Sequence, residues 1–380
     1  TAIVRREDES QTLGYTGQVV YIYSYDIAYD MARTPPLETL LGCPAVQFTV
    51  DASKRSPRQL VFYSPRSVRL PPVERLGPRG VTRIERSIKV LPVGALSIMV
   101  RVPFRVEQLS DLMAYHRLEF SNGALEDEMR ALAEDALREL RPRCIRPVDR
   151  IPPDEGYPVF CIASPPQMAD GSRFCAERWL AQHRREVASL LTQEQDTASL
   201  SEQEVAESTG KYLSYYDHDL VVLDWDAALI IDEPRHFDET LFIMELANLQ
   251  LAELEAYDRL LDEAVERSYR DLERRGMRGR RDVMKRLREI RIDLARLSDE
   301  ISNISKFFGD WHLARIYQAL SERFHLAEWH HIIDEKLRTL DSLYSLHKQD
   351  QMNRWMLVLE SAIVLLFILD LIVLYAGIEK

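Results

Sequence analysis

The strongest constraint in this sequence is a long apolar stretch from Trp355 to Gly377. It has 23 residues without Lys, Arg or Pro, and as a helix it would span about 34 Å, enough to cross the hydrocarbon core of a bilayer. Aromatic rings prefer the headgroup layer, and Trp355 and Tyr375 stand near the two ends. Lys348 and Arg354 precede the stretch. We therefore predict a C-terminal transmembrane helix in residues 351–380 and a tail-anchored protein with its bulk on the side of these cations.

Two acids, Glu360 and Asp370, interrupt this stretch. An acid near the bilayer centre costs about 3 kcal/mol, so each needs a polar contact. Glu360 is near enough to one end to reach the interface, whereas Asp370 lies near the midpoint. We predict that both acids contact neighbouring subunits, and that the homo-oligomer is larger than a dimer. A buried core helix is the alternative, but such a helix is seldom apolar on every side.

The remaining composition indicates a globular protein with a real core. The chain has 380 residues, of which 46% are hydrophobic, and a net charge of −12. This charge disfavours indiscriminate binding to nucleic acid. The four cysteines form no CxxC pair, so neither a zinc site nor a disulfide framework is predicted, and a reducing compartment fits best.

Residues 1–14 are polar and predict a flexible tail, and residues 15–234 predict an α+β domain. Short β-branched and aromatic runs separated by Pro and Gly indicate one mostly antiparallel sheet. Runs with apolar residues three and four apart indicate helices. The predicted strands are Val19–Tyr25, Ala45–Val50, Gln59–Ser64, Val81–Leu91, Ala95–Phe104, Pro158–Ser164 and a pair within Lys211–Asp232; the predicted helices are Val106–Phe120, Gly123–Leu140 and Arg173–Leu191.

Residues 235–350 predict a long helical hairpin or coiled-coil stalk. Phe237–Arg275 lacks Gly and Pro, and two further helices, Trp311–Phe324 and Leu326–His347, lead to the apolar stretch. Between Arg275 and Trp311, apolar residues recur at alternating spacings of four and three. This seam of apolar residues predicts that helices pair there as in a coiled coil. The seam residues are Val283, Leu287, Ile290, Leu294, Leu297, Ile301, Ile304 and Phe308.

Arginines crowd the predicted turn between the two long helices. Arg278, Arg280 and Arg281 are candidates for contact with phosphate, of rRNA or of lipid headgroups. The alternative is a solvated surface whose cations pair with nearby acids. No aromatic residue is interleaved with the arginines, so stacking on bases and sequence-specific nucleic-acid binding are not expected.

Four common nucleotide-binding and catalytic motifs do not occur in the sequence. Neither GxGxxG nor GxxxxGK[ST] occurs, and neither GxSxG nor HExxH is found. The acids between Asp217 and Glu233 are candidates for a metal site or, alternatively, for turn and strand ends. We predict no catalytic residue, no metal and no cofactor, and hence no enzyme.

The C-terminal half resembles a known family. LVVLDWDAALIID and the segment from Ile301 to Val373 resemble the required for meiotic nuclear division (Rmd/Sif) family, a domain-of-unknown-function family of C-terminally membrane-anchored proteins. The matching positions are Trp311, Tyr317, Leu337, Leu340, Tyr344, Arg354, Leu359 and Glu360. The resemblance implies a membrane-anchored homo-oligomer and, for mitochondrial relatives, a matrix-facing factor that supports translation.

Taken together, these features predict a non-enzymatic membrane scaffold that displays its α+β domain to a partner and tethers the ribosome or another large complex to the membrane. The bulk is expected in the cytoplasm, at a bacterial inner membrane, or in the mitochondrial matrix. The alternative is a membrane-tethered enzyme or small-ligand sensor with its site in the α+β domain, near Tyr25, Asp26, Tyr29 and Asp30.

Overall fold

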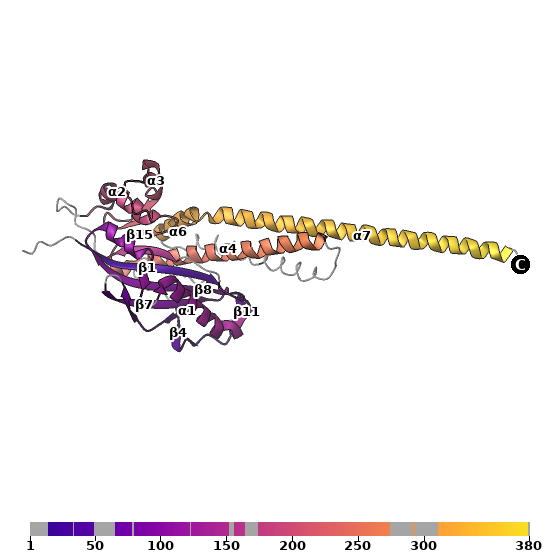
Figure 1. Ribbon diagram of the computed structural model, residues 1–380, viewed down its shortest axis with the longest axis horizontal. Coiled ribbons are helices and arrows are strands. Elements are labelled where there is room, and N and C mark those ends of the chain that lie inside the picture. Colours follow the sequence, from indigo (N-terminus) through magenta and orange to yellow (C-terminus); the bar gives the residue numbers. More distant parts are fainter. Residues whose placement is uncertain are drawn as a thin grey trace, which may run out of the picture. The chain divides into compact units, whose positions relative to one another are not determined.

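The computed structural model describes residues 14–32, 34–48, 65–77, 80–121, 123–151, 156–163, 174–273, 292 and 311–378 (Figure 1). The chain forms two units. The first contains residues 1–255 and 297–327, and the second contains residues 256–296 and 328–380. The predicted tail and the predicted strand Gln59–Ser64 lie outside the described residues.

Three long antiparallel strands form the centre of the first unit: β1 (Tyr15–Asp26), β7 (Gly80–Leu91) and β8 (Ala95–Val106). β1 pairs with β8 along its whole length, from Tyr15 opposite Val106 to Asp26 opposite Ala95. The shorter strands are β2 (Ala28–Met31), β3 (Thr39–Leu40), β4 (Cys43–Gln47), β5 (Arg66–Arg69), β6 (Val73–Gly77), β9 (Glu119–Phe120), β10 (Gly123–Ala124), β11 (Cys144–Pro147), β12 (Tyr157–Ile162), β13 (Tyr212–Leu213), β14 (Leu220–Leu223) and β15 (Ala228–Ile231).

Among the described residues, the main sheet has 11 strands in the order β13-β14-β15-β12-β1-β8-β7-β5-β4-β3, with β6 paired to β7. Among the described pairs only β12 and β15 run parallel. Two small ribbons, β9 with β10 and β2 with β11, lie outside the sheet. The predicted mostly antiparallel sheet of an α+β fold is therefore confirmed.

The helical elements follow and interrupt these strands. They are η1 (Leu109–Tyr115), α1 (Leu125–Leu140), η2 (Arg141–Arg143), α2 (Ala176–Thr192), α3 (Glu202–Ser208), η3 (Pro234–His236), α4 (Phe237–Glu273), α6 (Trp311–Arg323) and α7 (Leu326–Ile378). The C-terminal part of the described chain is thus helical, as the sequence predicts.

Protein covers both faces of the central strands. Val19, Tyr21 and Tyr23 of β1 belong to the core that also holds residues of η1, α1 and α2. The opposite face meets α4, whose Glu245 accepts hydrogen bonds from Lys89 on β7 and from Ser97 on β8. Because alternate residues point to opposite faces, β1 is buried on both sides.

One predicted helix is wrong. Residues 106–120 end strand β8, form the 3-10 helix η1 and reach strand β9. The buried residues of η1 are Leu109, Leu112 and Tyr115, each three positions apart, which suits the three residues per turn of a 3-10 helix. Apolar residues three positions apart also occur in the pattern of an α-helix, which is why the sequence predicts an α-helix here.

In the second unit the C-terminal part of α4 and the N-terminal part of α7 run side by side and in the same direction (Figure 1). Leu261 of α4 and Ile333, Leu337 and Leu340 of α7 are buried. Lys336 Nζ lies 2.6 Å from a carboxylate oxygen of Asp258 and 2.6 Å from one of Asp262. Within the described part of the chain, no helix is both long and apolar enough to cross a membrane.

Candidate functional site

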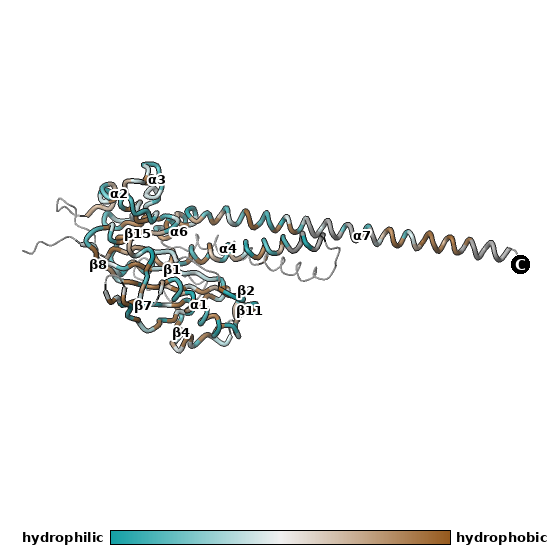
Figure 2. The backbone as a smooth tube through the Cα atoms, viewed as in Figure 1, coloured by the Kyte–Doolittle hydropathy of each residue, from teal (hydrophilic) through white to brown (hydrophobic). Residues whose placement is uncertain are grey.

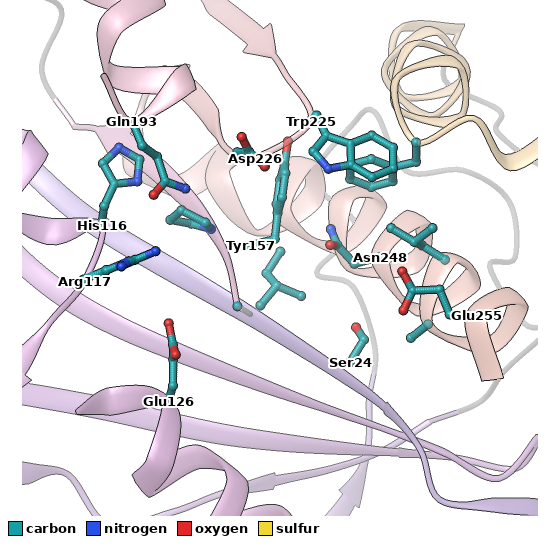
Figure 3. Close-up of a pocket in the computed structure, with 16 residues that line it drawn as sticks. Ser24, His116, Arg117, Glu126, Tyr157, Gln193, Trp225, Asp226, Asn248 and Glu255 are labelled. Carbon is teal, nitrogen blue, oxygen red and sulfur yellow. The ribbon is translucent and has the colours of Figure 1, made fainter. Parts of the chain in front are cut away.

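A cavity of about 310 Å³ opens in the first unit, and all its lining residues belong to that unit (Figure 3). They come from β1, the link between η1 and β9, α1, the start of β12, the end of α2, the turn between β14 and β15, α4 and the end of α6. A size of 300 Å³ or more is typical of small-molecule sites. This convergence makes the cavity the candidate binding site.

The sheet itself creates the floor of the cavity. β12 pairs with β1 only as far as Ile22, opposite Tyr157, so that β1 continues beyond its neighbour. Gly156, just before β12, lies against the ring of Tyr23, and a Cβ atom there would be 2.5 Å from that ring. A glycine is therefore needed for this close approach, which shapes the lining beside Ser24.

His116 is a lining residue whose pKa is strongly altered by burial. Its Nε2 atom lies 2.6 Å from the carbonyl oxygen of Leu190, and since a carbonyl only accepts, Nε2 carries the proton. Burial lowers the pKa of His116 from 6.5 to about 4, although the bond to Leu190 opposes the shift. The ring is therefore neutral near pH 7. Its Nδ1 is a buried acceptor without a hydrogen-bond partner in the described part of the chain.

Arg117 and Glu126, like His116, line two cavities. A second cavity, of about 320 Å³, is lined by the same three residues together with Tyr21, Tyr23 and the start of α1. Figure 3 shows Arg117 and Glu126 on the same side of the first cavity, from the η1–β9 link and from α1. The shared residues give this region one cation, one carboxylate and one neutral acceptor.

Aromatic rings form another wall. Tyr157 packs edge-on against Phe324 at a centroid distance of 5.4 Å, and Trp225 does so at 6.0 Å. The hydroxyl of Tyr157 donates to the carbonyl oxygen of Asp224 at 2.9 Å, and burial raises its pKa well above 10. The phenol is therefore a fixed donor, and the exposed Asp226 lies next to this wall.

The predicted site residues lie elsewhere. The seam from Val283 to Phe308 and the arginines 278, 280 and 281 are outside the described residues. Glu360 is exposed on α7, and the side chain of Asp370 is not among those described. The seam, the arginines and the two acids therefore stay predictions.

The acidic segment from Asp217 to Glu233 stabilises its own turns. Asp219 accepts from the backbone N–H groups of Tyr215 and Tyr216, at 2.6 Å and 3.2 Å. Asp224 accepts from the N–H of Trp225 at 2.9 Å. In the described residues, no group of three or more His, Cys, Asp and Glu side chains is placed to hold a metal ion.

The four residues near which the alternative site was expected do not line either of these cavities. Tyr25 is buried in the core, and Asp26 ends β1. Tyr29 and Asp30 belong to the ribbon of β2 and β11. The sequence reasoning missed His116, Arg117 and Glu126, because the first two were placed on a helix. A histidine followed by an arginine is too common a pair to mark a site.

Comparisons with known proteins identify the relatives. A model of the family described as "Uncharacterized protein MJ0711, N-terminal domain" matches residues 16–238. The uncharacterized protein MJ0711 of Methanocaldococcus jannaschii is 27% identical over 225 residues, which are 59% of this chain and 67% of that protein. No solved structure matches the chain.

These matches correct the predicted resemblance. The chain was assigned to the Rmd/Sif family, but the family found is a different one, and its match covers residues 16–238. The resemblance rested mainly on the order of helices in the C-terminal half. Such an order follows from general features of a stalk and an apolar helix, and it is weak evidence for a family.

Proposed function

The chain belongs to the family of the MJ0711 N-terminal domain, and on that premise we propose that it is a membrane-anchored, non-enzymatic scaffold. The α+β unit is displayed to a partner, and the helices that follow it associate with other copies of the chain. The bulk of the chain lies on the cytoplasmic or matrix side, where Lys348 and Arg354 precede the apolar segment.

One observation carries this proposal: the exposed apolar segment of α7. From Trp355 to Leu371, the large apolar side chains are each 51% to 67% exposed. Figure 2 shows the hydrophobic colouring along this part of α7. A contiguous apolar surface of this kind marks a contact with lipid or with another protein.

The length of the segment favours lipid. Side chains are described without a break from Trp355 to Leu369, and the sequence continues apolar to Gly377. A helix needs about 20 apolar residues to cross a bilayer. Residues 355–377 of the sequence meet that length once the positions whose side chains the structure does not describe are included. Aromatic residues near both ends fit the two interfaces.

Self-association is the second part of the proposal. The described contacts between α4 and α7, with Lys336 between two aspartates, support a helical stalk. The seam of residues 283–308 supplies the apolar surface for pairing, as a coiled coil requires. Replacing Leu294 and Leu297 by Asp should reduce the assembly size in detergent. An unchanged size would show that the seam is not an association surface.

The arginines of the turn remain our proposed contact with phosphate, either of anionic lipid or of a ribosome. Changing Arg278, Arg280 and Arg281 to Glu should weaken binding to anionic vesicles or ribosomes, and binding by the native chain should fall as salt rises. Salt-insensitive binding would assign the arginines to a solvated turn.

Membrane extraction tests the anchor directly. We expect the full chain, expressed in bacteria, to stay in the membrane pellet after alkaline carbonate washing. Leu365→Lys with Ile368→Lys adds about 6 kcal/mol to insertion and should release the chain. The matched control is Leu76→Lys with Val81→Lys. These two residues face each other across β6 and β7, and their side chains are likewise exposed, by 58% and 67%. Release of the native chain, or equal release by both pairs, would refute the anchor.

The cavity is the specific observation that favours the second candidate, a small-ligand sensor. Its lining combines polar groups with an aromatic wall, as binding sites do. The two functions are compatible, since ligand binding by the α+β unit requires no catalysis.

A further inference from the structure

We propose that the cavity of the first unit binds a small organic cation that carries several N–H donors, such as an amine or a guanidine. This inference goes beyond the anchoring function and does not depend on it, because every lining residue lies in the first unit.

The charge of the lining favours a cation. Glu126, Asp226 and Glu255 contribute three carboxylates, whereas Arg117 contributes one guanidinium. His116 adds no charge near pH 7, since burial holds its pKa near 4. Carboxylates therefore outnumber cations in the lining, and a cleft with an excess of negative charge concentrates positive ligands.

The hydrogen-bonding groups favour donors on the ligand. His116 has its proton on Nε2, so the atom left for a ligand, Nδ1, only accepts. Asn248 donates from its amide nitrogen to the carbonyl oxygen of Met244 at 2.9 Å, and its other amide atom, Oδ1, is an acceptor. With the carboxylate of Glu126, these groups form a set of acceptors contributed by three different elements.

The aromatic wall supplies a second kind of attraction. Trp225 is 44% exposed beside Asp226, and Phe324 and Tyr157 pack behind it. A cation over an indole or phenyl face gains about 0.5 to 2 kcal/mol. Figure 3 shows the Trp225 ring and the Asp226 carboxylate on the same side of the cavity, with Tyr157 between them.

The volume limits the size of the ligand. About 310 Å³ corresponds to roughly ten water molecules, at the lower end of small-molecule sites. The second cavity, of about 320 Å³, shares His116, Arg117 and Glu126 as lining residues. Agmatine, which has an amine at one end and a guanidine at the other, and spermidine are therefore suitable probes.

Isothermal titration calorimetry of the full chain in detergent tests the proposal. We expect agmatine or spermidine to bind, and neutral glycerol and anionic citrate not to bind. Glu126→Gln should weaken binding about tenfold, because a charge-assisted hydrogen bond is lost. Asp127→Asn is the matched control, since this exposed acid of the same helical turn does not line the cavity.

A second variant guards against misfolding of the first. Trp225→Leu keeps an apolar side chain and should weaken agmatine binding several-fold by removing the indole face. Thermal unfolding of both variants checks that the unit is intact. The variant Leu365→Lys with Ile368→Lys should bind agmatine as the native chain does, which separates this proposal from the membrane anchor.

Three outcomes would overturn the proposal. The first is the absence of binding by both agmatine and spermidine. The second is binding of citrate that Arg117→Ala abolishes, since the cavity would then be an anion site. The third is equal weakening by Glu126→Gln and Asp127→Asn, which would indicate attraction to the acidic surface as a whole.

Discussion

Strand β1 and the α7 segment from Trp355 to Leu371 are two apolar regions that differ in what covers them. Val19, Val20 and Ile22 of β1 are at most 1% exposed, because helices pack on both faces of the sheet. The large apolar side chains of the α7 segment are at least 51% exposed. The comparison shows that an apolar run is a core element only where other parts of the chain bring side chains against it.

An aspartate introduced into each region should have very different effects on stability, and this is the largest effect that we expect. Val20→Asp buries a carboxylate between β8 and β12, and we expect a loss of more than about 4 kcal/mol in the free energy of unfolding. Val364→Asp, on the exposed segment, should leave unfolding of the α+β unit unchanged. Urea denaturation followed by fluorescence in detergent measures both. Equal losses would mean that the two regions are covered alike.

A buried ion pair lies in the packing between the central strands and α4, and removing one partner should cost less than the introduced aspartate. Lys89 and Glu245 are 7% and 3% exposed, and the Lys89 ammonium lies 3.8 Å from the centre of the Phe48 ring. Glu245→Ala leaves a buried cation unpaired and should cost about 3 to 5 kcal/mol. The double variant Lys89→Met with Glu245→Leu should recover most of this loss. A double variant as unstable as Glu245→Ala would show that the pair itself supplies the stability.

His116, in the same unit as β1, makes the stability of that α+β unit depend on pH. Its pKa is lowered to about 4 by burial, so the folded state binds fewer protons than the unfolded state between pH 6.5 and 4. The contribution of His116 is therefore complete above pH 6.5 and is lost as the pH falls toward 4, by about 1 to 3 kcal/mol in all.

Urea titrations at several pH values measure this effect. His116→Gln should flatten the loss between pH 6.5 and 4 relative to the native chain. His331→Gln, which changes an exposed histidine of α7, is the control and should keep the native slope. Parallel slopes for all three proteins would show that His116 is not protected from protonation.

The smallest effect is expected for Asp370, one of the two acids within the exposed segment. If lipid covers α7, Asp370 needs a polar neighbour, and Asp370→Leu should lower the oligomer state while the span inserts more readily. Polar contacts between membrane helices contribute about 0.6 to 2 kcal/mol, so the shift is partial. Native mass spectrometry compares this variant with Ile368→Leu. An unchanged mass distribution would show that Asp370 makes no contact between subunits.

Elements with a strong local pattern could be predicted from the sequence. The 37-residue helix α4 follows from a run without Gly or Pro, and β7 and β8 follow from apolar runs between glycines and prolines. The reversal between β14 and β15 was also placed correctly, at Asp224 to Asp226. The α-helix predicted for residues 106–120 was wrong, because apolar residues spaced by three suit both an α-helix and a 3-10 helix.

Patterns within a few residues were therefore enough to predict the α+β class, the helical C-terminal part and most element types, since these depend on close neighbours in the chain. The position of β1 between β8 and β12, and the parallel pairing of β12 with β15, depend instead on contacts between distant segments and came from the structure. The structure also decided the candidate site, where His116 meets Leu190 and Tyr157 meets Asp224. These partners are 74 and 67 residues apart, and no local pattern specifies which distant residue will complete a hydrogen bond.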